Sequence, residues 1–122
     1  MLKTLMLKTL MLVRRSWRWP ALRRKTIKSS PCCAACGGTK KLVVHHIKPF
    51  HLFPKLELDP TNLIVLCEDK ESNCHLRIGH GRDWDMWNPH VVQDAAILRA
   101  NPLLRSTVWI NARNAAIKTL SV

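Results

Sequence analysis

Histidine, asparagine and cysteine side chains recur through the middle of this 122-residue chain in an order that suits hydrolysis of a phosphate ester. His45 and His46 are adjacent, Asn62 follows them, and His75 comes directly after Cys74. Hydrolysis of a phosphodiester needs a base that activates water and ligands that hold a metal ion on the scissile phosphate. Imidazole can fill both roles, because it titrates near neutrality and binds metals.

The two adjacent histidines are expected to have different tasks. Branched residues at 42–47 predict a short strand, and residues 63–66 predict a second one. Neighbouring residues of a strand point to opposite faces, so His45 and His46 cannot easily be ligands of one metal. One of them can bind the metal while the other faces a water molecule beside it. A pair of surface histidines is the alternative interpretation.

Four cysteines are expected to form a structural zinc site. Two pairs of thiolates, one on each side of a hairpin, are the usual way to build a closed zinc site. Cys33 and Cys36 have the spacing of a zinc knuckle. Six residues separate Cys67 from Cys74, a wider gap that a polar loop at 68–73 explains, because loops lengthen at little cost.

Two alternatives for the cysteines stay open. Cys67 could be a thiol of the core, which would leave three ligands, and Cys32 could take the place of Cys33. The count of five is odd and the cysteines are clustered, which does not favour a secreted disulfide framework. A reducing compartment fits better, and a cytoplasmic location is expected.

Positive charge is concentrated in the first half of the chain. The net charge is +12, and residues 1–56 contain 13 Lys and Arg but no acidic residue. This asymmetry predicts a polyanionic partner, most often nucleic acid, and a solvated basic tail is the alternative. The residues expected to bind nucleic acid are Arg14, Arg15, Arg18, Arg23, Arg24, Lys25, Lys28 and Lys48.

The chain has room for one small domain, whose marginal core a metal would help to stabilise. It has no run of 18 apolar residues, so no transmembrane helix is expected. The expected organisation is a basic and apolar arm at 1–15, a basic helix at 16–30, a core at 31–90 and a helical segment at 91–122. The apolar side of a helix at 91–100 is expected to consist of Val91, Ala95, Ile97 and Leu98.

Two tryptophans, Trp84 and Trp87, follow the histidines. We expect them to cap the core, since a domain this small needs aromatic area, and stacking on a nucleobase or sugar is the alternative. His51 and His90 have no expected role.

The stretch from Pro31 to Pro89 resembles the HNH endonucleases, which are the ββα-metal or His-Me finger nucleases, in the small zinc-knuckle form found in phages and prophages. The resemblance rests on the sequences CAAC, VVHHIKPF, LDPTNLIVLC and NCHLRIGHG. It implies a small α+β fold in which structural zinc stabilises a ββα-metal domain flanked by helices. It also implies metal-dependent hydrolysis of double-stranded DNA and, by analogy alone, phage packaging proteins as partners.

The resemblance implies a role for each matched residue. His46 matches the general base, and His45 matches the first ligand of a catalytic divalent ion, which could be Mg²⁺, Mn²⁺, Ni²⁺ or Zn²⁺. His75 matches the final histidine of the motif, which is also a ligand. Asn62 matches the central asparagine, whose amide holds the loop that orients the strand bearing the base.

His80 is a further candidate ligand. Many relatives place such a ligand four residues after the final histidine, whereas His80 follows His75 by five. A kink at Gly79 could restore the position, and a cap or a phosphate contact is the alternative for His80.

Two other functions stay open: a non-catalytic zinc-stabilised module that binds nucleic acid, and an inactive HNH relative. RNA also stays open as a substrate.

Overall fold

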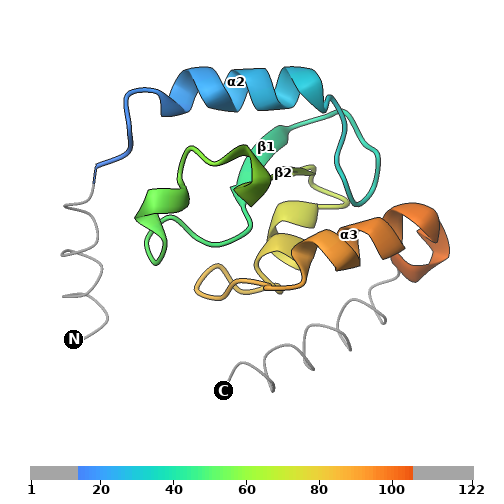
Figure 1. Cartoon of the computed structure of the whole chain (residues 1–122). Coiled ribbons are helices and arrows are strands. Elements are labelled where there is room, and N and C mark those ends of the chain that lie inside the picture. The colour runs from blue at the N-terminus through green and yellow to red at the C-terminus, as the bar shows by residue number, and fades with distance from the viewer. Residues whose placement is uncertain (1–13, 106–122) are drawn as a thin grey trace.

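The computed structural model describes residues 14–105 (Figure 1). The arm expected up to residue 13 and the helical segment expected from residue 106 lie outside the described residues. The main elements are α2 (Trp19–Ser29), β1 (Leu42–His46), β2 (Leu63–Cys67), a π-helix called η3 (His75–Gly79) and α3 (Val91–Ala100). Short 3-10 turns occupy Pro54–Leu56, Pro60–Asn62 and Pro102–Arg105. The predicted small α+β class is confirmed. No helix within residues 14–105 is long and apolar enough to cross a membrane.

β1 and β2 form a two-stranded antiparallel sheet in which Leu42 lies opposite Cys67. Branched apolar residues favour the pleated conformation of a strand, and each strand ends within one residue of its predicted bound. The loop that joins the strands is closed at its base, where the Ile47 N–H donates to the Asn62 carbonyl at 2.8 Å. The sheet therefore holds both ends of this long loop together.

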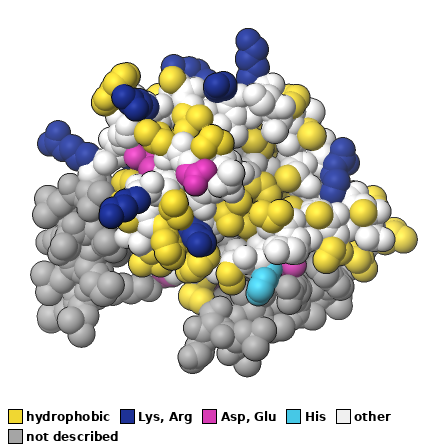
Figure 2. Space-filling model, viewed as in Figure 1, with side chains coloured by type: hydrophobic (Ala, Val, Ile, Leu, Met, Phe, Trp, Pro, Cys, Tyr) yellow, Lys and Arg dark blue, Asp and Glu magenta, His cyan; other side chains and the backbone are white. Residues whose placement is uncertain are grey.

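α2 begins three residues later than predicted, because Ser16 to Arg18 form a turn. The Trp19 N–H donates to the Ser16 carbonyl at 3.0 Å, and Pro20 occupies the first turn of the helix, where its missing N–H costs nothing. No residue of α2 is buried, although Leu22 is half-buried. α2 runs along the top of the sheet in Figure 1, and several Lys and Arg side chains project from this edge in Figure 2.

The hydrophobic core lies between the sheet, η3 and α3. Leu66 of β2 and Val91 and Leu98 of α3 are among its fully buried side chains. Three cysteines belong to the same packed cluster: Cys33, Cys67 and Cys74. The group of cysteines and the apolar core are thus one unit.

The predicted apolar side of α3 is wrong at one position. Ile97 is 44% exposed, whereas Asp94 is buried. The buried residues of α3 are Val91, Asp94, Ala95 and Leu98, the spacing of one helix face with 3.6 residues per turn. Ile97 lies outside that face. The burial of Asp94 was not predicted, because a carboxylate is rarely buried without partners.

Asn88 supplies a partner for Asp94 and joins η3 to α3. Its side-chain Nδ2 donates to the Ile78 carbonyl at 3.0 Å and to Oδ2 of Asp94 at 2.9 Å. Its main-chain N–H donates to the Gly79 carbonyl at 3.0 Å, and its Oδ1 accepts from the His90 N–H at 2.9 Å. Because the side chain is only 1% exposed, water cannot replace these bonds, and Asn88 fixes η3 against α3.

We predict that Asn88→Ala lowers the free energy of unfolding by about 2–3 kcal/mol, because it leaves buried polar groups without their partner. Urea denaturation monitored by tryptophan fluorescence measures the change. Asn101→Ala is the matched control, since Asn101 is exposed and donates a single bond to the Ile97 carbonyl. An equal loss in the two variants would contradict the role assigned to Asn88.

Candidate metal and catalytic centre

A tight knuckle brings Cys33 and Cys36 together. The Cys33 N–H donates to the Gly38 carbonyl at 2.7 Å, and the Gly37 N–H donates to the Cys33 carbonyl at 2.8 Å. Gly37 has a φ of +75°, and a Cβ at this position would collide with the guanidinium of Arg99. The left-handed backbone conformation favours glycine at this position, whereas the flexible end of the Arg99 side chain could move aside.

The structure brings together the four cysteines predicted to bind zinc. The sulfur atoms of Cys33, Cys36, Cys67 and Cys74 all lie within 4.8 Å of one another, and those of Cys36 and Cys67 are 3.7 Å apart. Sulfurs at ~2.3 Å from a tetrahedral zinc ion are separated by about 3.8 Å. The cluster can therefore hold a structural metal such as zinc. Cys32 is not part of it, and all five cysteines are free of disulfides.

A hydrogen bond within the cysteine cluster also favours a charged thiolate. This bond joins the thiols of Cys33 and Cys74, and it lowers the pKa of Cys33 while it raises that of Cys74. A thiolate is the form of cysteine that binds metals. Burial raises the pKa of Cys36, so among Cys33, Cys36 and Cys74 the thiolate is favoured at Cys33.

Three histidines form a second cluster at the other end of the sheet. The ligand nitrogens of His45, His75 and His80 lie within 4.8 Å of one another. Two of the rings are oriented by acceptors: Nδ1 of His75 lies 2.9 Å from Oε1 of Glu68, and Nδ1 of His80 lies 2.8 Å from the Met86 carbonyl oxygen. Because both partners accept, the network assigns the proton to Nδ1, and each Nε2 keeps its lone pair.

The nitrogen atoms of this cluster suit a metal cation. The Nε2 atoms of His75 and His80 lie 3.2 Å apart, although the assigned tautomers leave both of them as acceptors. Nε2 of His45 is buried and has no hydrogen-bond partner within the described residues. Burial lowers the pKa of His45 to about 2, so its ring is neutral, as a ligand must be. A divalent ion would satisfy all three nitrogens.

The π-helical turn η3 explains how His80 reaches this cluster. An α-helix brings residues four positions apart onto one face, but His80 follows His75 by five positions. In η3 the turn is wider, and the His80 N–H donates to the His75 carbonyl at 3.1 Å, an i to i+5 bond. The wider turn, and not the suggested kink at Gly79, takes up the additional residue.

Gly79 has a different role, which is to let η3 approach the strands. A Cβ at this position would lie 3.1 Å from Cε1 of His45 and 3.2 Å from Cδ1 of Leu66. These distances are shorter than ordinary contacts, so a larger residue would push η3 away from β1. Gly79 thereby keeps His45 close to the histidines of η3.

His46 is not part of the three-histidine cluster, and its ring contacts other residues. Its Nε2 lies 3.0 Å from the Glu57 carbonyl oxygen, and its ring packs on Trp19 with centroids 4.5 Å apart. A carbonyl can only accept, so Nε2 carries the proton and Nδ1 keeps the lone pair. Burial lowers the pKa of His46, so the ring is neutral at neutral pH. A neutral ring with a free lone pair can accept a proton.

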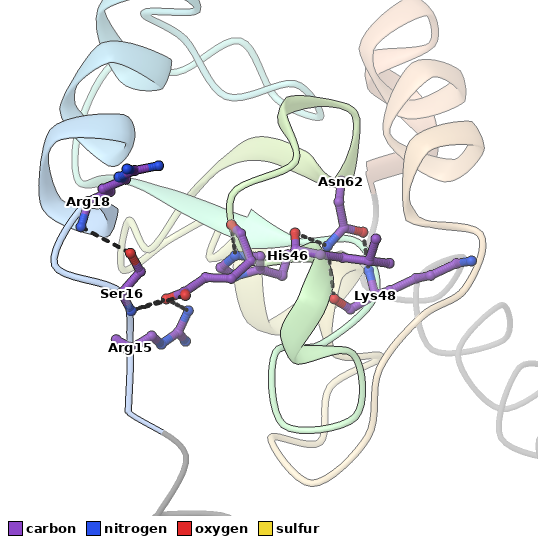
Figure 3. Close-up of polar contacts among 8 residues, drawn as sticks. Arg15, Ser16, Arg18, His46, Lys48 and Asn62 are labelled. Carbon is purple, nitrogen blue, oxygen red and sulfur yellow. Dashed lines mark hydrogen bonds and ion pairs between the residues drawn. The ribbon is translucent and has the colours of Figure 1, made fainter.

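Asn62 closes the loop that carries Glu57, the hydrogen-bond partner of His46 (Figure 3). Its Oδ1 accepts from the Lys48 N–H at 2.8 Å, and its Nδ2 donates to the Lys48 carbonyl at 3.1 Å and to the Leu56 carbonyl at 3.3 Å. Asn62 is buried, so these bonds are shielded from water. The amide therefore fixes the chain just after His46 and just before Glu57.

Both histidine groups open onto one pocket of about 320 Å³. Its walls include His45, His46, His75, His80, Arg15, Phe50, His51 and Trp84. Trp84 is 54% exposed and contacts the rings of His75 and His80, with centroids 5.2 Å and 4.9 Å apart. The expectation that Trp84 caps the core is wrong, because it covers the histidines instead. Trp87 packs on Phe53 with ring centroids 6.1 Å apart.

The basic residues predicted to bind nucleic acid divide into two groups. Most have exposed side chains: Arg14, Arg18, Arg23, Arg24, Lys25, Lys28 and Lys48. Arg15 differs, because it lines the pocket. Nothing in the sequence distinguishes Arg15 from its basic neighbours or indicates the acceptors that orient the histidines. These acceptors are the Glu57 carbonyl, the Glu68 carboxylate and the Met86 carbonyl.

Comparison with protein families matches residues 33–81 to the HNH endonuclease family. No curated protein and no solved structure matches the chain. The matched segment begins at the first cysteine of the four-sulfur cluster and ends one residue after His80, so it contains both clusters as well as His46 and Asn62. Residues 33–81 are therefore a domain of the HNH endonuclease family.

Proposed function

We propose that the protein is an endonuclease that hydrolyses phosphodiester bonds of double-stranded DNA with a divalent metal ion. The observation that carries this proposal is the single pocket lined by both histidine groups. On one side lie three imidazoles whose ligand nitrogens lie within 4.8 Å of one another, and on the other lies His46, whose Nε2 is held by the Glu57 carbonyl. A binding module would need neither a metal cluster in a pocket nor an oriented base beside it.

In the proposed reaction His46 is the general base. The oxygen of a water molecule forms a bond to phosphorus while Nδ1 of His46 takes its proton, and the bond from phosphorus to the 3′ oxygen breaks. The 3′ oxygen leaves and takes a proton from solvent, so the products carry a 5′-phosphate and a 3′-hydroxyl. A divalent ion held by His45, His75 and His80 would stabilise the negative charge on the phosphate and on the leaving oxygen.

The orientation of His46 depends on the loop between the strands. The Glu57 carbonyl accepts from Nε2 of His46, and Asn62 fixes the same loop at Leu56, directly before Glu57. Because its side chain binds the backbone of Lys48 and the carbonyl of Leu56, directly before Glu57, we assign Asn62 as a positioning residue for the base. Partners in phage packaging remain a prediction by analogy.

Double-stranded DNA is the substrate that the charge distribution supports. Arg23, Arg24 and Lys25 are exposed on α2, and no acidic residue precedes Glu57 in the chain. Cations on an exposed helix contact phosphates, which position a duplex but do not specify its sequence. We therefore propose cleavage with weak sequence specificity.

We propose that the four-cysteine cluster binds zinc and that this zinc is structural. The cluster is part of the hydrophobic core. It is separate from the three-histidine cluster, whose members line the pocket. A closed site of four thiolates leaves no position for substrate. Free thiols persist in a reducing compartment, so we place the protein in the cytoplasm.

The roles of His46 and His75 can be separated by experiment. His46→Ala should lower the rate of plasmid cleavage by about 10²–10⁴-fold, since it removes the base, but should leave metal binding intact. His75→Ala should instead weaken metal binding, with activity partly restored at high Mn²⁺. Supercoiled-plasmid cleavage and isothermal calorimetry with Mn²⁺ measure the two effects.

His90→Ala is the control for this pair, because His90 is exposed and does not line the pocket. Full cleavage by His46→Ala would exclude it as the base. Unchanged Mn²⁺ affinity in His75→Ala would show that the metal binds elsewhere.

Loss of zinc is expected to unfold the domain. Cys74→Ser should give protein that lacks zinc and melts without a cooperative transition, because metal binding and folding are coupled in small zinc domains. Cys32→Ser is the matched control and should keep about one zinc per chain and a normal melting curve. Elemental analysis and circular dichroism test both variants. Folded, active wild-type protein without zinc would contradict the proposal.

The basic face of α2 should determine how DNA binding depends on salt. Replacing Arg23, Arg24 and Lys25 together by Gln should weaken binding equally on unrelated duplexes. The slope of log affinity against log salt should become shallower by about one unit for each lost phosphate contact. Fluorescence anisotropy at several salt concentrations measures the slope, with Lys70→Gln as an exposed control outside α2. An unchanged slope in the triple variant would assign the DNA contacts to another surface.

A further inference from the structure

Arg15 occupies a different position from the other basic residues near α2. Its side chain is 48% exposed, and it lines the pocket together with the histidines. Among the described residues that line this pocket, Arg15 is the only one with a permanent positive charge. A phosphate that enters the pocket would therefore meet one fixed cation of the protein itself.

The guanidinium of Arg15 is held in place by aromatic rings. Its Cζ lies 4.3 Å from the ring centroid of Phe50 and 5.4 Å from that of Trp19. Phe50 also lines the pocket, and Trp19 packs on the ring of His46. Stacking of this kind restrains an arginine while it leaves the N–H groups at the edge of the guanidinium free to bind.

The backbone beside Arg15 is anchored to the loop that orients His46 (Figure 3). The Ser16 N–H donates to both carboxylate oxygens of Glu57, at 3.0 Å and 3.2 Å. The carbonyl of the same Glu57 accepts from Nε2 of His46. One residue thus fixes the base through its main chain and the backbone next to Arg15 through its side chain.

The ion pair between Arg15 and Glu57 leaves the guanidinium available to a ligand. Nη1 of Arg15 lies 3.8 Å from Oε2 of Glu57, which is too long for a hydrogen bond. The carboxylate already accepts two bonds from Ser16, so it orients Arg15 without saturating its donors. A guanidinium with free N–H groups binds two phosphate oxygens at once.

We propose that Arg15 is a catalytic residue that binds the non-bridging oxygens of the scissile phosphate. This inference rests on the proposed nuclease activity and deepens it. As water attacks, negative charge grows on these oxygens, and a fixed donor pair in a partly enclosed pocket stabilises that charge more than it stabilises the ground state. Arg15 therefore belongs with His46 and the metal cluster in function, and not with the exposed cations of α2.

The test is single-turnover cleavage of a plasmid at saturating enzyme, where differences in DNA affinity no longer affect the rate. Arg15→Gln should lower this rate by about 10²–10³-fold, the usual effect of removing a donor to a developing oxyanion. Arg15→Lys should recover only part of the loss, because it keeps the charge but lacks the paired donors. Arg82→Gln is the matched control, since Arg82 is exposed and does not line the pocket.

A small substrate separates chemistry from DNA binding. Bis(p-nitrophenyl) phosphate fits a pocket but cannot extend along α2. Arg15→Gln should lower kcat for this diester strongly, and Arg82→Gln should leave it unchanged. A zinc content and a melting temperature equal to those of the wild type would show that the Arg15 variants are folded. If Arg15→Gln is unstable, Arg15→Lys takes its place in both assays.

Two outcomes overturn the inference. One is a wild-type rate for Arg15→Gln at saturating enzyme, and the other is an equal loss in Arg82→Gln. If either outcome is found while wild-type protein cleaves DNA and His46→Ala does not, only the role of Arg15 is excluded and the proposed nuclease function stands. If wild-type protein itself cleaves neither DNA nor the small diester, the proposed nuclease function fails, and the inference fails with it.

Discussion

Four cysteine sulfurs that lie within 4.8 Å of one another come from segments that are far apart in the sequence. Cys33 and Cys36 belong to the knuckle before the sheet, Cys67 ends β2, and Cys74 directly precedes η3. A chain of this length buries a modest fraction of its surface, so its apolar core alone is marginal. The cysteine cluster lies inside that core, against Leu66, Val91 and Leu98. A single bound ion would therefore connect the knuckle, the sheet and η3.

The position of the cysteine cluster also determines where the histidines of η3 lie. His75 follows Cys74 directly, so whatever fixes Cys74 also fixes the start of η3. His46, His75 and His80 each have one ring nitrogen hydrogen-bonded to an acceptor. The other ring nitrogen is left to bind a metal or a proton. Two of these acceptors are main-chain carbonyls, at Glu57 and Met86. Their position depends on the path of the backbone and tolerates changes of side chain.

Local patterns in the sequence predicted the parts of the fold that depend on neighbouring residues. The alternation of side chains along a strand placed His45 and His46 on opposite faces, and the two-residue gap between Cys33 and Cys36 predicted the knuckle. The strands and α3 end within one residue of their predicted bounds. Such features follow from spacings of two to four residues, which a sequence shows directly.

Contacts between distant segments could not be predicted in this way. The bond between Ser16 and Glu57 spans 41 residues, and nothing near either residue indicates it. The burial of Asn88 depends on how α3 packs on η3, which its neighbours in the sequence do not indicate. The face of α3 was misassigned at Ile97 because hydrophobicity was used without the partner that allows Asp94 to be buried. Metal ligation by the histidines and the roles of the basic residues stay predictions.

The π-helical turn of η3 has a consequence for how such a domain can vary in length. One residue added to a regular α-helix rotates everything after it by about 100° around the axis. In η3 the additional residue is confined to one wide turn, which closes again at His80. Asn88 and α3 can then meet the core in the same orientation with or without it. Related chains in which the second histidine follows the first by four or by five positions could thus share one architecture. A search that demands a fixed spacing would separate them.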